Sequence, residues 1–195
     1  MNSVQNDVPS RPLKILLHSK AFFPSIGGIE SVSRNLAEGL TLLGHKVTVV
    51  TSTNADTTTH DDFTFSVVRR PSVSERVKLL QGHDLVLSNG ASLDYIVPAF
   101  FFRRPLIWIH AGYQICSIDG LGWYHGEAAP LAPCASIIFH CRKQGILRGL
   151  KLGALLGLRR FARNFISREI AITNWVANRL KLSHDSVIYN PFPLT

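Results

Sequence analysis

Residues 14–51 decide the fold, and they read K-I-L-L-H-S-K-A-F-F-P-S-I-G-G-I-E-S-V-S-R-N-L-A-E-G-L-T-L-L-G-H-K-V-T-V-V-T. The apolar run at 13–19 has the length of a buried strand, and the β-branched run at 46–51 predicts another. Between them, apolar residues recur at helical spacing over 28–43, and Gly44 follows where a helix C-cap is expected. A strand, a helix and a second strand in this order predict one parallel βαβ unit.

The same alternation continues along the chain. It predicts an α/β fold with a Rossmann-like, doubly wound and mostly parallel sheet, covered by helices on both faces. Further strands are expected at 63–69, 85–88, 106–110, 169–173 and 186–189, and further helices at 74–81, 93–102, 147–166 and 174–182. Residues 111–146 break the alternation and contain many Gly, Pro, Cys and aromatic residues, so we expect an insertion at the carboxyl edge of the sheet.

The two ends of the sequence differ from the region between them. Residues 1–12 are polar and are expected to form a disordered tail, while 13–189 form one domain of ordinary size. Residues 190–195 contain two prolines and no periodicity, which is typical of a linker.

The composition suits a packed domain. Of the 195 residues, 46% are hydrophobic and 17% are charged, which is too apolar for a disordered chain. No run of eighteen apolar residues predicts a membrane span, and residues 1–11 lack the apolar core of an export signal. Three cysteines without an export signal favour a reducing compartment, so we expect a cytoplasmic protein.

The net charge of +8 is concentrated in one segment. Ten of the 21 Lys and Arg residues fall between Arg142 and Lys181, together with one acid, Glu169. This segment carries +9 and the rest of the chain −1, which indicates an anionic partner, either phosphate groups or a membrane surface. Few aromatic residues accompany the charges and no recognition motif is present, so nucleic acid is not expected as a partner.

Two adjacent glycines, Gly27 and Gly28, stand where the first strand turns into the first helix. Glycines let the backbone approach a ligand, and a helix N-terminus offers free N–H groups to phosphate. The alternative is that the pair simply makes a tight turn. A nicotinamide cofactor is not expected, because the G-x-G-x-x-G spacing is absent and Thr51-Ser52 replace the acid that would bind ribose.

Residues 14–51 resemble the opening of glycosyltransferase family 4, with its P-x-x-G-G-x-E loop, its N-L-A-x-x-L helix and its G-H-x-V-x-V-x-T strand. Residues 83–90, 105–110, 169–180 and 186–192 resemble later strands and turns of the same family. The resemblance implies one half of a GT-B fold, in which two Rossmann-like domains face each other across a cleft. It implies that this chain is the N-terminal, acceptor-side domain and that the C-terminal donor domain is absent.

The resemblance also implies roles for single residues. His110, at the end of a strand, would be the catalytic residue that contacts the transferred sugar, and Gly27 and Gly28 would approach the donor diphosphate. Asn190 would be the hinge toward the second domain. The residues expected at the acceptor or in the cleft are Glu30, Asn89, Gly90, Tyr113 and Thr173.

The implied function is the acceptor-binding half of a retaining glycosyltransferase. The parent enzyme would move a sugar from an NDP-sugar to a lipid-linked or saccharide acceptor without a cofactor, and this chain alone would be inactive. The alternatives are a non-catalytic binding module and a subunit of a split glycosyltransferase that works with a separate donor-domain chain. A homo-oligomer is a further option, because a lone half would expose an apolar face.

Three cysteines, Cys116, Cys134 and Cys141, fall in the insertion. Some enzymes similar to family 4 carry four cysteines there, and this chain has Leu131 in place of one of them. Structural zinc prefers four ligands, and His125 could supply the fourth. We favour the alternative of three buried thiols and no metal.

The helix expected at 147–166 is amphipathic. Its apolar stripe is Leu147, Leu150, Ala154, Leu158, Phe161 and Phe165. The basic residues expected on the opposite arc are Arg148, Lys151, Arg159 and Arg163. Either the helix rests on anionic lipid at the inner face of a membrane, or its stripe packs on the sheet and its basic face meets solvent. Gly149, Gly153 and Gly157 recur every fourth residue and would allow another backbone to approach closely.

Overall fold

Six parallel strands form one sheet in the computed structural model, which describes residues 11–54, 62–112, 114–117 and 122–190. Their order across the sheet is β3-β2-β1-β4-β5-β8. The strands are β1 (Lys14–Ser19), β2 (Lys46–Thr51), β3 (Ser66–Arg69), β4 (Leu85–Asn89), β5 (Leu106–His110) and β8 (Arg168–Ala171). The predicted α/β, Rossmann-like, doubly wound parallel sheet is therefore confirmed.

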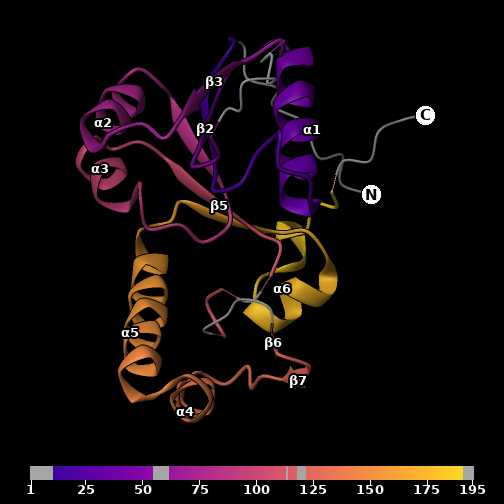
Figure 1. Cartoon of the computed structure of the whole chain (residues 1–195). Coiled ribbons are helices and arrows are strands. Elements are labelled where there is room, and N and C mark those ends of the chain that lie inside the picture. The colour runs from indigo at the N-terminus through magenta and orange to yellow at the C-terminus, as the bar shows by residue number, and fades with distance from the viewer. Residues whose placement is uncertain (1–10, 55–61, 113, 118–121, 191–195) are drawn as a thin grey trace.

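Helices cover both faces of this sheet (Figure 1). Alternate residues of β1 show how the faces differ: Ile15 and Leu17 pack under helix α1 (Gly28–Leu42), while Leu16 faces the opposite core. That second core receives buried side chains from α2 (Val73–Gln81), α3 (Ile96–Phe101) and α6 (Asn174–Leu180). The two cores bury the sheet on both sides, as a parallel sheet requires.

The segment after β5 forms regular structure that the sequence did not predict. It contains a hairpin of β6 (Trp123–Tyr124) and β7 (Glu127–Ala128), followed by helix α4 (Pro133–Gln144). Pro133 occupies the first turn of α4, where its missing N–H has no intrahelical role. The proline that suggested irregular structure therefore begins a helix. Figure 1 shows α4 and the hairpin beyond the carboxyl edge of the sheet.

Helix α5 (Ile146–Ala162) follows α4 directly and crosses it closely. A Cβ atom on Gly149 would lie 2.6 Å from both the Cα and the N of Cys141, and one on Gly153 would lie 3.0 Å from Cγ1 of Ile137. A Cβ on Gly157 would meet nothing within 4 Å. Two of the three glycines therefore allow the close approach that their spacing predicted.

The orientation of α5 differs from the simple amphipathic prediction. Gly149, Leu156 and Ala162 are the buried residues of this helix, whereas all six residues of the predicted apolar stripe are exposed. Arg159 and Arg163 lie on the inner side and are only partly exposed. The prediction that these two arginines face a membrane is therefore wrong, since both belong to the side that packs on the domain.

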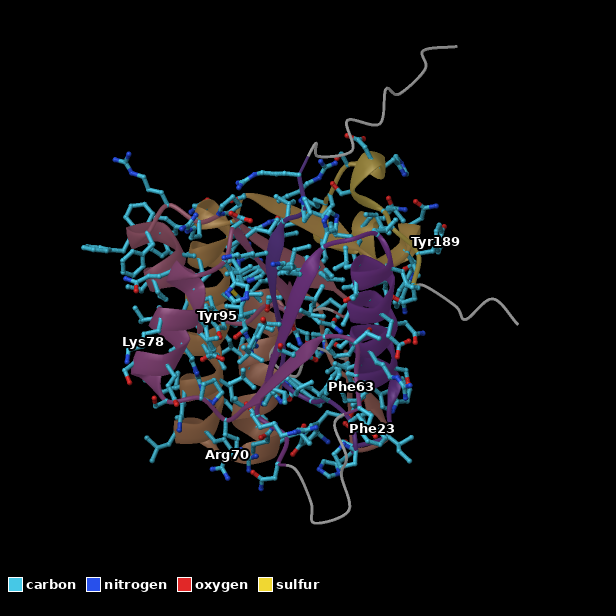
Figure 2. The ribbon with its side chains drawn as sticks, turned by 90° about the horizontal axis from the view of Figure 1, so that it is seen from above. Phe23, Phe63, Arg70, Lys78, Tyr95 and Tyr189 are labelled. Atoms are coloured by element: carbon cyan, nitrogen blue, oxygen red, sulfur yellow. The ribbon has the colours of Figure 1, made fainter. Side chains whose placement is uncertain are left out.

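Two of the expected strands also differ from the structure. The strand expected at 186–189 does not form: a single bridge joins Ala171 to Val187, after the short 3-10 helix η2 (His184–Ser186). Strand β3 begins at Ser66, and Phe63 and Phe65 instead stack with ring centroids 4.9 Å apart. Figure 2 shows Phe23 and Phe63 next to each other beside α1, and Tyr95 in the interior.

We predict opposite effects on stability for two alanine substitutions in α5. Gly149→Ala would press a methyl group into the backbone of α4, so the free energy of unfolding should fall by about 1–3 kcal/mol. Gly157→Ala meets open space and should raise it by up to about 1 kcal/mol, because alanine favours the helix. Chemical denaturation of both variants tests this, and a Gly149→Ala protein as stable as the parent would contradict the close crossing.

Candidate functional site

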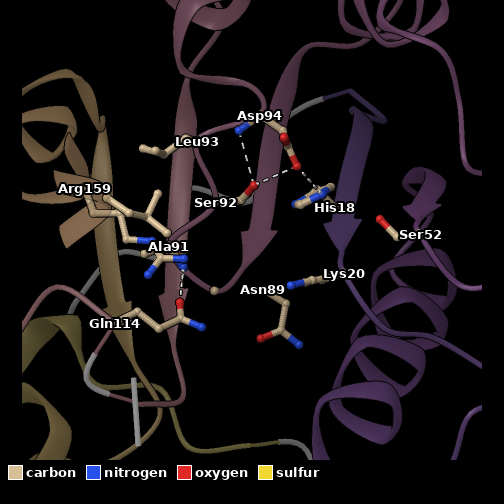
Figure 3. Close-up of a pocket in the computed structure, with 12 residues that line it drawn as sticks. His18, Lys20, Ser52, Asn89, Ala91, Ser92, Leu93, Asp94, Gln114 and Arg159 are labelled. Carbon is tan, nitrogen blue, oxygen red and sulfur yellow. Dashed lines mark hydrogen bonds and ion pairs between the residues drawn. The ribbon is translucent and has the colours of Figure 1, made fainter. Parts of the chain in front are cut away.

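A cavity of about 330 Å³ opens where the carboxyl ends of β1 and β4 meet helix α5 (Figure 3). Strand β1 pairs with β2 on one side and with β4 on the other, so the strand order changes direction between β1 and β4. Open α/β sheets bind ligands at this position. The polar residues that line the cavity are His18, Lys20, Ser52, Asn89, Ser92, Asp94, Gln114 and Arg159.

His18 and Asp94 form the best-connected polar pair of the cavity. His18 is buried in β1; its Nε2 lies 3.4 Å from Oδ2 of Asp94, and its Nδ1 lies 3.2 Å from Oγ of Ser88. The hydroxyl of Ser88 donates its own hydrogen to the Gly90 carbonyl, so it can only accept from His18. Both ring nitrogens of His18 therefore have a polar partner, the carboxylate of Asp94 on one side and the hydroxyl of Ser88 on the other.

Asp94 is held as an anion by its surroundings. Hydrogen bonds from His18 and Ser92, together with the charges of His18 and Arg76, outweigh burial and lower the pKa of Asp94 to about 2. Nη1 of Arg76 lies 3.3 Å from Oδ1 of Asp94. The carboxylate therefore has partners on both oxygens, and it fixes the imidazole of His18 at the cavity wall.

Two cations, Lys20 and Arg159, give the cavity its positive character. Figure 3 shows their charged ends directed toward the same space, Lys20 from the end of β1 and Arg159 from α5. Neither forms an ion pair with any of the described residues, and Nε of Arg159 is buried there without a hydrogen-bond partner. Burial lowers the pKa of Arg159, which still leaves a cation at neutral pH. An anionic ligand fits this arrangement best.

Gly90 and Asn89, both predicted for the cleft, lie at the cavity. Gly90 has φ +108°, a conformation that favours glycine, and a Cβ there would lie 3.1 Å from Oε1 of Gln114. Gln114 accepts a hydrogen bond from the backbone N–H of Ala91 and so closes the loop. The amide of Asn89 donates to Oγ of Ser33, 2.8 Å away, and thereby ties β4 to α1.

The glycine turn lies at the N-terminus of α1, as predicted, since Gly27 is the N-cap and Gly28 the first helical residue. Neither glycine lines the cavity. The carboxylate of Glu30 folds over Gly27, and its Oε1 accepts a hydrogen bond from Oγ of Ser25, 2.9 Å away. A Cβ at Gly27 would displace this carboxylate, so the absence of a side chain there lets Glu30 lie against the turn.

His110 lies at the end of β5, but its side chain is fully buried and does not line the cavity. Its Nε2 lies 2.9 Å from Oε1 of Glu169, whose other oxygen accepts a hydrogen bond from Arg163. Burial alone would raise the pKa of Glu169, and the hydrogen bonds and charges of His110 and Arg163 reverse this and lower it. Nδ1 of His110 has no partner among the described residues. Its catalytic role stays a prediction.

The remaining predicted residues have other surroundings. Thr173 caps α6, because its hydroxyl accepts a hydrogen bond from the backbone N–H of Val176. Asn190 is the last described residue, and Tyr113 lies outside the described residues.

The cysteines and His125 do not form a zinc site in the described part of the chain, where no cluster of three or more His, Cys, Asp or Glu could hold a metal. Cys134 is exposed, and the Cys116 thiol donates to the carbonyl of Arg179 at 3.7 Å. Burial raises the pKa of Cys116, which keeps this thiol protonated.

Sequence reasoning missed most of the cavity. The sequence predicted Arg159 on a basic helix face and no role for His18, Lys20, Asp94 or Gln114. One signal was present: polar residues follow the first and the fourth expected strands, and these strands are neighbours at the switch point of a doubly wound sheet.

No protein-family model and no curated protein matches the chain. Among solved structures, HepE of Anabaena in complex with UDP is similar over 92% of this chain and 44% of HepE, at 18% identity and a TM-score of 0.57. A glycosyltransferase from Rickettsia africae is similar over 91% of this chain and 42% of that chain, at 14% identity and a TM-score of 0.49. The chain spans less than half the length of either protein. The likeness to HepE establishes a shared Rossmann-like fold, consistent with one half of a GT-B architecture.

We predict that Asp94→Asn destabilises the protein in a pH-dependent manner. The pKa of Asp94 is lowered from 3.8 to about 2 on folding, so the stability it contributes is present above about pH 4 and is lost as the pH falls toward 2. Because the side chain is 45% exposed, screening limits the effect to about 1 kcal/mol, or about 2–4 °C in Tm. Melting curves of the parent and the variant at about pH 7 and below pH 4 should show a difference in Tm that narrows on acidification. Asp185→Asn, which changes an exposed carboxylate outside this cluster, is the control. A difference in Tm between the parent and Asp94→Asn that does not change with pH would contradict the ion pairs.

Proposed function

We propose that this chain is the acceptor-binding half of a retaining glycosyltransferase, which moves a sugar from an NDP-sugar to a lipid-linked or saccharide acceptor. The observation that carries the proposal is the positively charged cavity at the switch point of the sheet, with Lys20 and Arg159 directed into it. The likeness to HepE, which was solved with UDP, supports a phosphate-bearing ligand on this fold.

The cavity residues divide into two groups under this proposal. Lys20 and Arg159 neutralise a phosphate, either of the donor diphosphate or of a phosphate-linked acceptor. The N-terminus of α1 at Gly27 and Gly28, which lies outside the cavity, would offer N–H groups to a second phosphate of the donor. His18, fixed by Asp94, and Gln114 face the sugar hydroxyls. A neutral ligand would leave both cations uncompensated, so a phosphate-bearing substrate is favoured.

His110 contacts the transferred sugar in this proposal, and Glu169 acts as its positioning residue. The carboxylate of Glu169 is shared between His110 and Arg163, so it holds the imidazole in one orientation. Nδ1 of His110 is unpaired but buried, so a substrate hydroxyl would reach it only after neighbouring groups move and expose it.

Turnover in this proposal needs residues beyond these 195, because the chain spans only 44% of HepE. The remaining donor site would belong to a second domain or a separate chain, and the protein would work in the cytoplasm at the inner face of a membrane. A non-catalytic binding module, or a subunit of a split glycosyltransferase, is the second candidate.

We predict that UDP and geranyl phosphate bind the cavity and that Lys20→Ala and Arg159→Ala each weaken this binding about tenfold or more, as expected for the loss of a charge-assisted hydrogen bond. UDP tests the donor phosphate and geranyl phosphate tests a lipid-linked acceptor. Isothermal titration calorimetry at two salt concentrations measures the affinities. Lys46→Ala removes a lysine at the opposite edge of the sheet and should leave them unchanged. If neither ligand binds, or if all three variants bind equally, the cavity is not a phosphate site.

Glycosyl transfer and nucleotide-sugar hydrolysis should also be measured across UDP- and GDP-sugars, with the purified chain alone and with extract of its own cells. We expect no activity alone and activity with extract, which would indicate a separate donor-domain chain. Activity of the chain alone would overturn the assignment of the donor site to other residues. No activity with or without extract, in a chain whose cavity still binds a phosphate-bearing ligand, would favour the binding module.

A further inference from the structure

Helix α5 presents an apolar stripe that no part of the described chain covers. Leu147 is 86% exposed, Leu158 57% and Phe161 63%, and the stripe ends at Phe165 in the short 3-10 helix η1 (Arg163–Phe165). The opposite side of the same helix is buried at Leu156 and Ala162. The stripe therefore faces away from the domain along the whole length of the helix.

Helix α3 extends this stripe into a broader surface. The rings of Phe100 in α3 and Phe165 lie 5.4 Å apart, and Phe161 lies 5.4 Å from Phe165. Phe101 is 78% exposed beside them, and Figure 1 shows α3 next to the C-terminal end of α5. The α3–α5 apolar surface is defined as Val97, Phe100, Phe101, Leu147, Leu150, Leu158, Phe161 and Phe165.

This surface is large for a protein in water. The largest apolar patch of a typical soluble monomer covers about 300–600 Å², and its four phenylalanines alone approach that area. A groove of about 640 Å³ also opens between Phe100, Phe101 and Phe165, with Arg103 and Arg104 on its rim. Such a surface indicates a binding partner.

Unpaired cations border the apolar side chains. Arg103, Arg148 and Lys151 are exposed and form no ion pair with any of the described residues. The only acid between residues 142 and 181 is Glu169, and its carboxylate is occupied by His110 and Arg163. The partner must therefore present apolar groups and negative charge together.

We propose that the α3–α5 apolar surface docks on a bilayer that contains anionic lipid. Its phenylalanines and leucines would enter the boundary between headgroups and acyl chains, while Arg103, Arg148 and Lys151 contact lipid phosphates. No helix among the described residues is long and apolar enough to cross a bilayer, so the contact lies in the interface. A second copy of the chain fits less well, because a symmetric pair would bring the same unpaired cations together.

The two sides of α5 then have different partners, the cavity on one side and lipid on the other. Leu155 and Arg159 line the cavity from the inner side, while the apolar stripe meets lipid on the outer side. Docking would therefore hold the cavity beside the headgroups, within reach of an acceptor anchored in the bilayer. Only this choice of acceptor rests on the proposed function; the docking itself depends on the surface alone.

Flotation with vesicles tests the docking without any nucleotide. The full chain should float with vesicles of phosphatidylcholine and phosphatidylglycerol, weakly with phosphatidylcholine alone, and less as the salt concentration rises. Leu147→Ser combined with Leu158→Ser should lower the partition coefficient at least about tenfold, because two leucines lose their burial in lipid. Arg148→Glu combined with Lys151→Glu should remove the preference for anionic vesicles.

A matched pair of leucines on another element provides the control. Leu42 and Leu43, at the end of α1, are 88% and 75% exposed and lie outside the α3–α5 apolar surface. Leu42→Ser combined with Leu43→Ser should bind vesicles like the parent chain. Melting curves of both double variants show whether they fold, and UDP binding without vesicles should be the same in all of them.

Absence of vesicle binding by the folded parent chain would overturn the docking, as would equal binding by both leucine double variants. Light scattering on a sizing column tests whether a second copy of the chain occupies the surface instead. If the parent is a dimer that does not bind vesicles, and Leu147→Ser with Leu158→Ser converts it to a monomer, the surface belongs to a second copy. If UDP still binds the parent chain in either case, the proposed function is unaffected. Vesicle binding without UDP binding would leave only the docking.

Discussion

A parallel sheet is stable in water only when both of its faces are covered, and this constraint arranges the rest of the protein. Helix α1 covers one face, and α2, α3 and α6 contribute to the other. Because all six strands run in one direction, their carboxyl ends share a single edge, where the loops after β1 and β4 separate. The cavity is a consequence of this arrangement, since chain segments that diverge to opposite faces leave space between them.

The elements that cover the sheet could be predicted from the sequence because burial imposes a pattern. The bounds expected for β2 and β5 agree with the structure, since each is a continuous run of apolar or β-branched residues. The prediction of the last strand was wrong. Ile188 and Tyr189 have strand-forming side chains, but both are exposed, so pairing this segment with the sheet would bury no apolar surface. Helix α4 was missed because proline, which usually interrupts a helix, here begins one.

The site was harder to predict, because its residues come from distant segments. His18 lies within an apolar strand, and only the folded chain brings Asp94 and Arg76 to it. Periodicity also cannot tell which side of a helix meets the protein. It showed which residues of α5 share a side, but the close crossing at Gly149 turns the side with Arg159 and Arg163 inward, and both arginines find polar surroundings there.

Helix α5 combines two arrangements that each cost free energy in the free protein. On its inner side Arg159 is partly buried with no carboxylate beside it among the described residues, and a buried, unpaired cation is unfavourable. On its outer side large apolar side chains remain in water. A phosphate in the cavity would offset the first cost and a lipid surface the second. Any ligand that binds only the folded state stabilises it. Relief of these two unfavourable arrangements would therefore contribute to the binding free energy of the phosphate and of the bilayer. The same helix would then couple the two, since a bilayer that steadies α5 also steadies the cavity wall carrying Arg159.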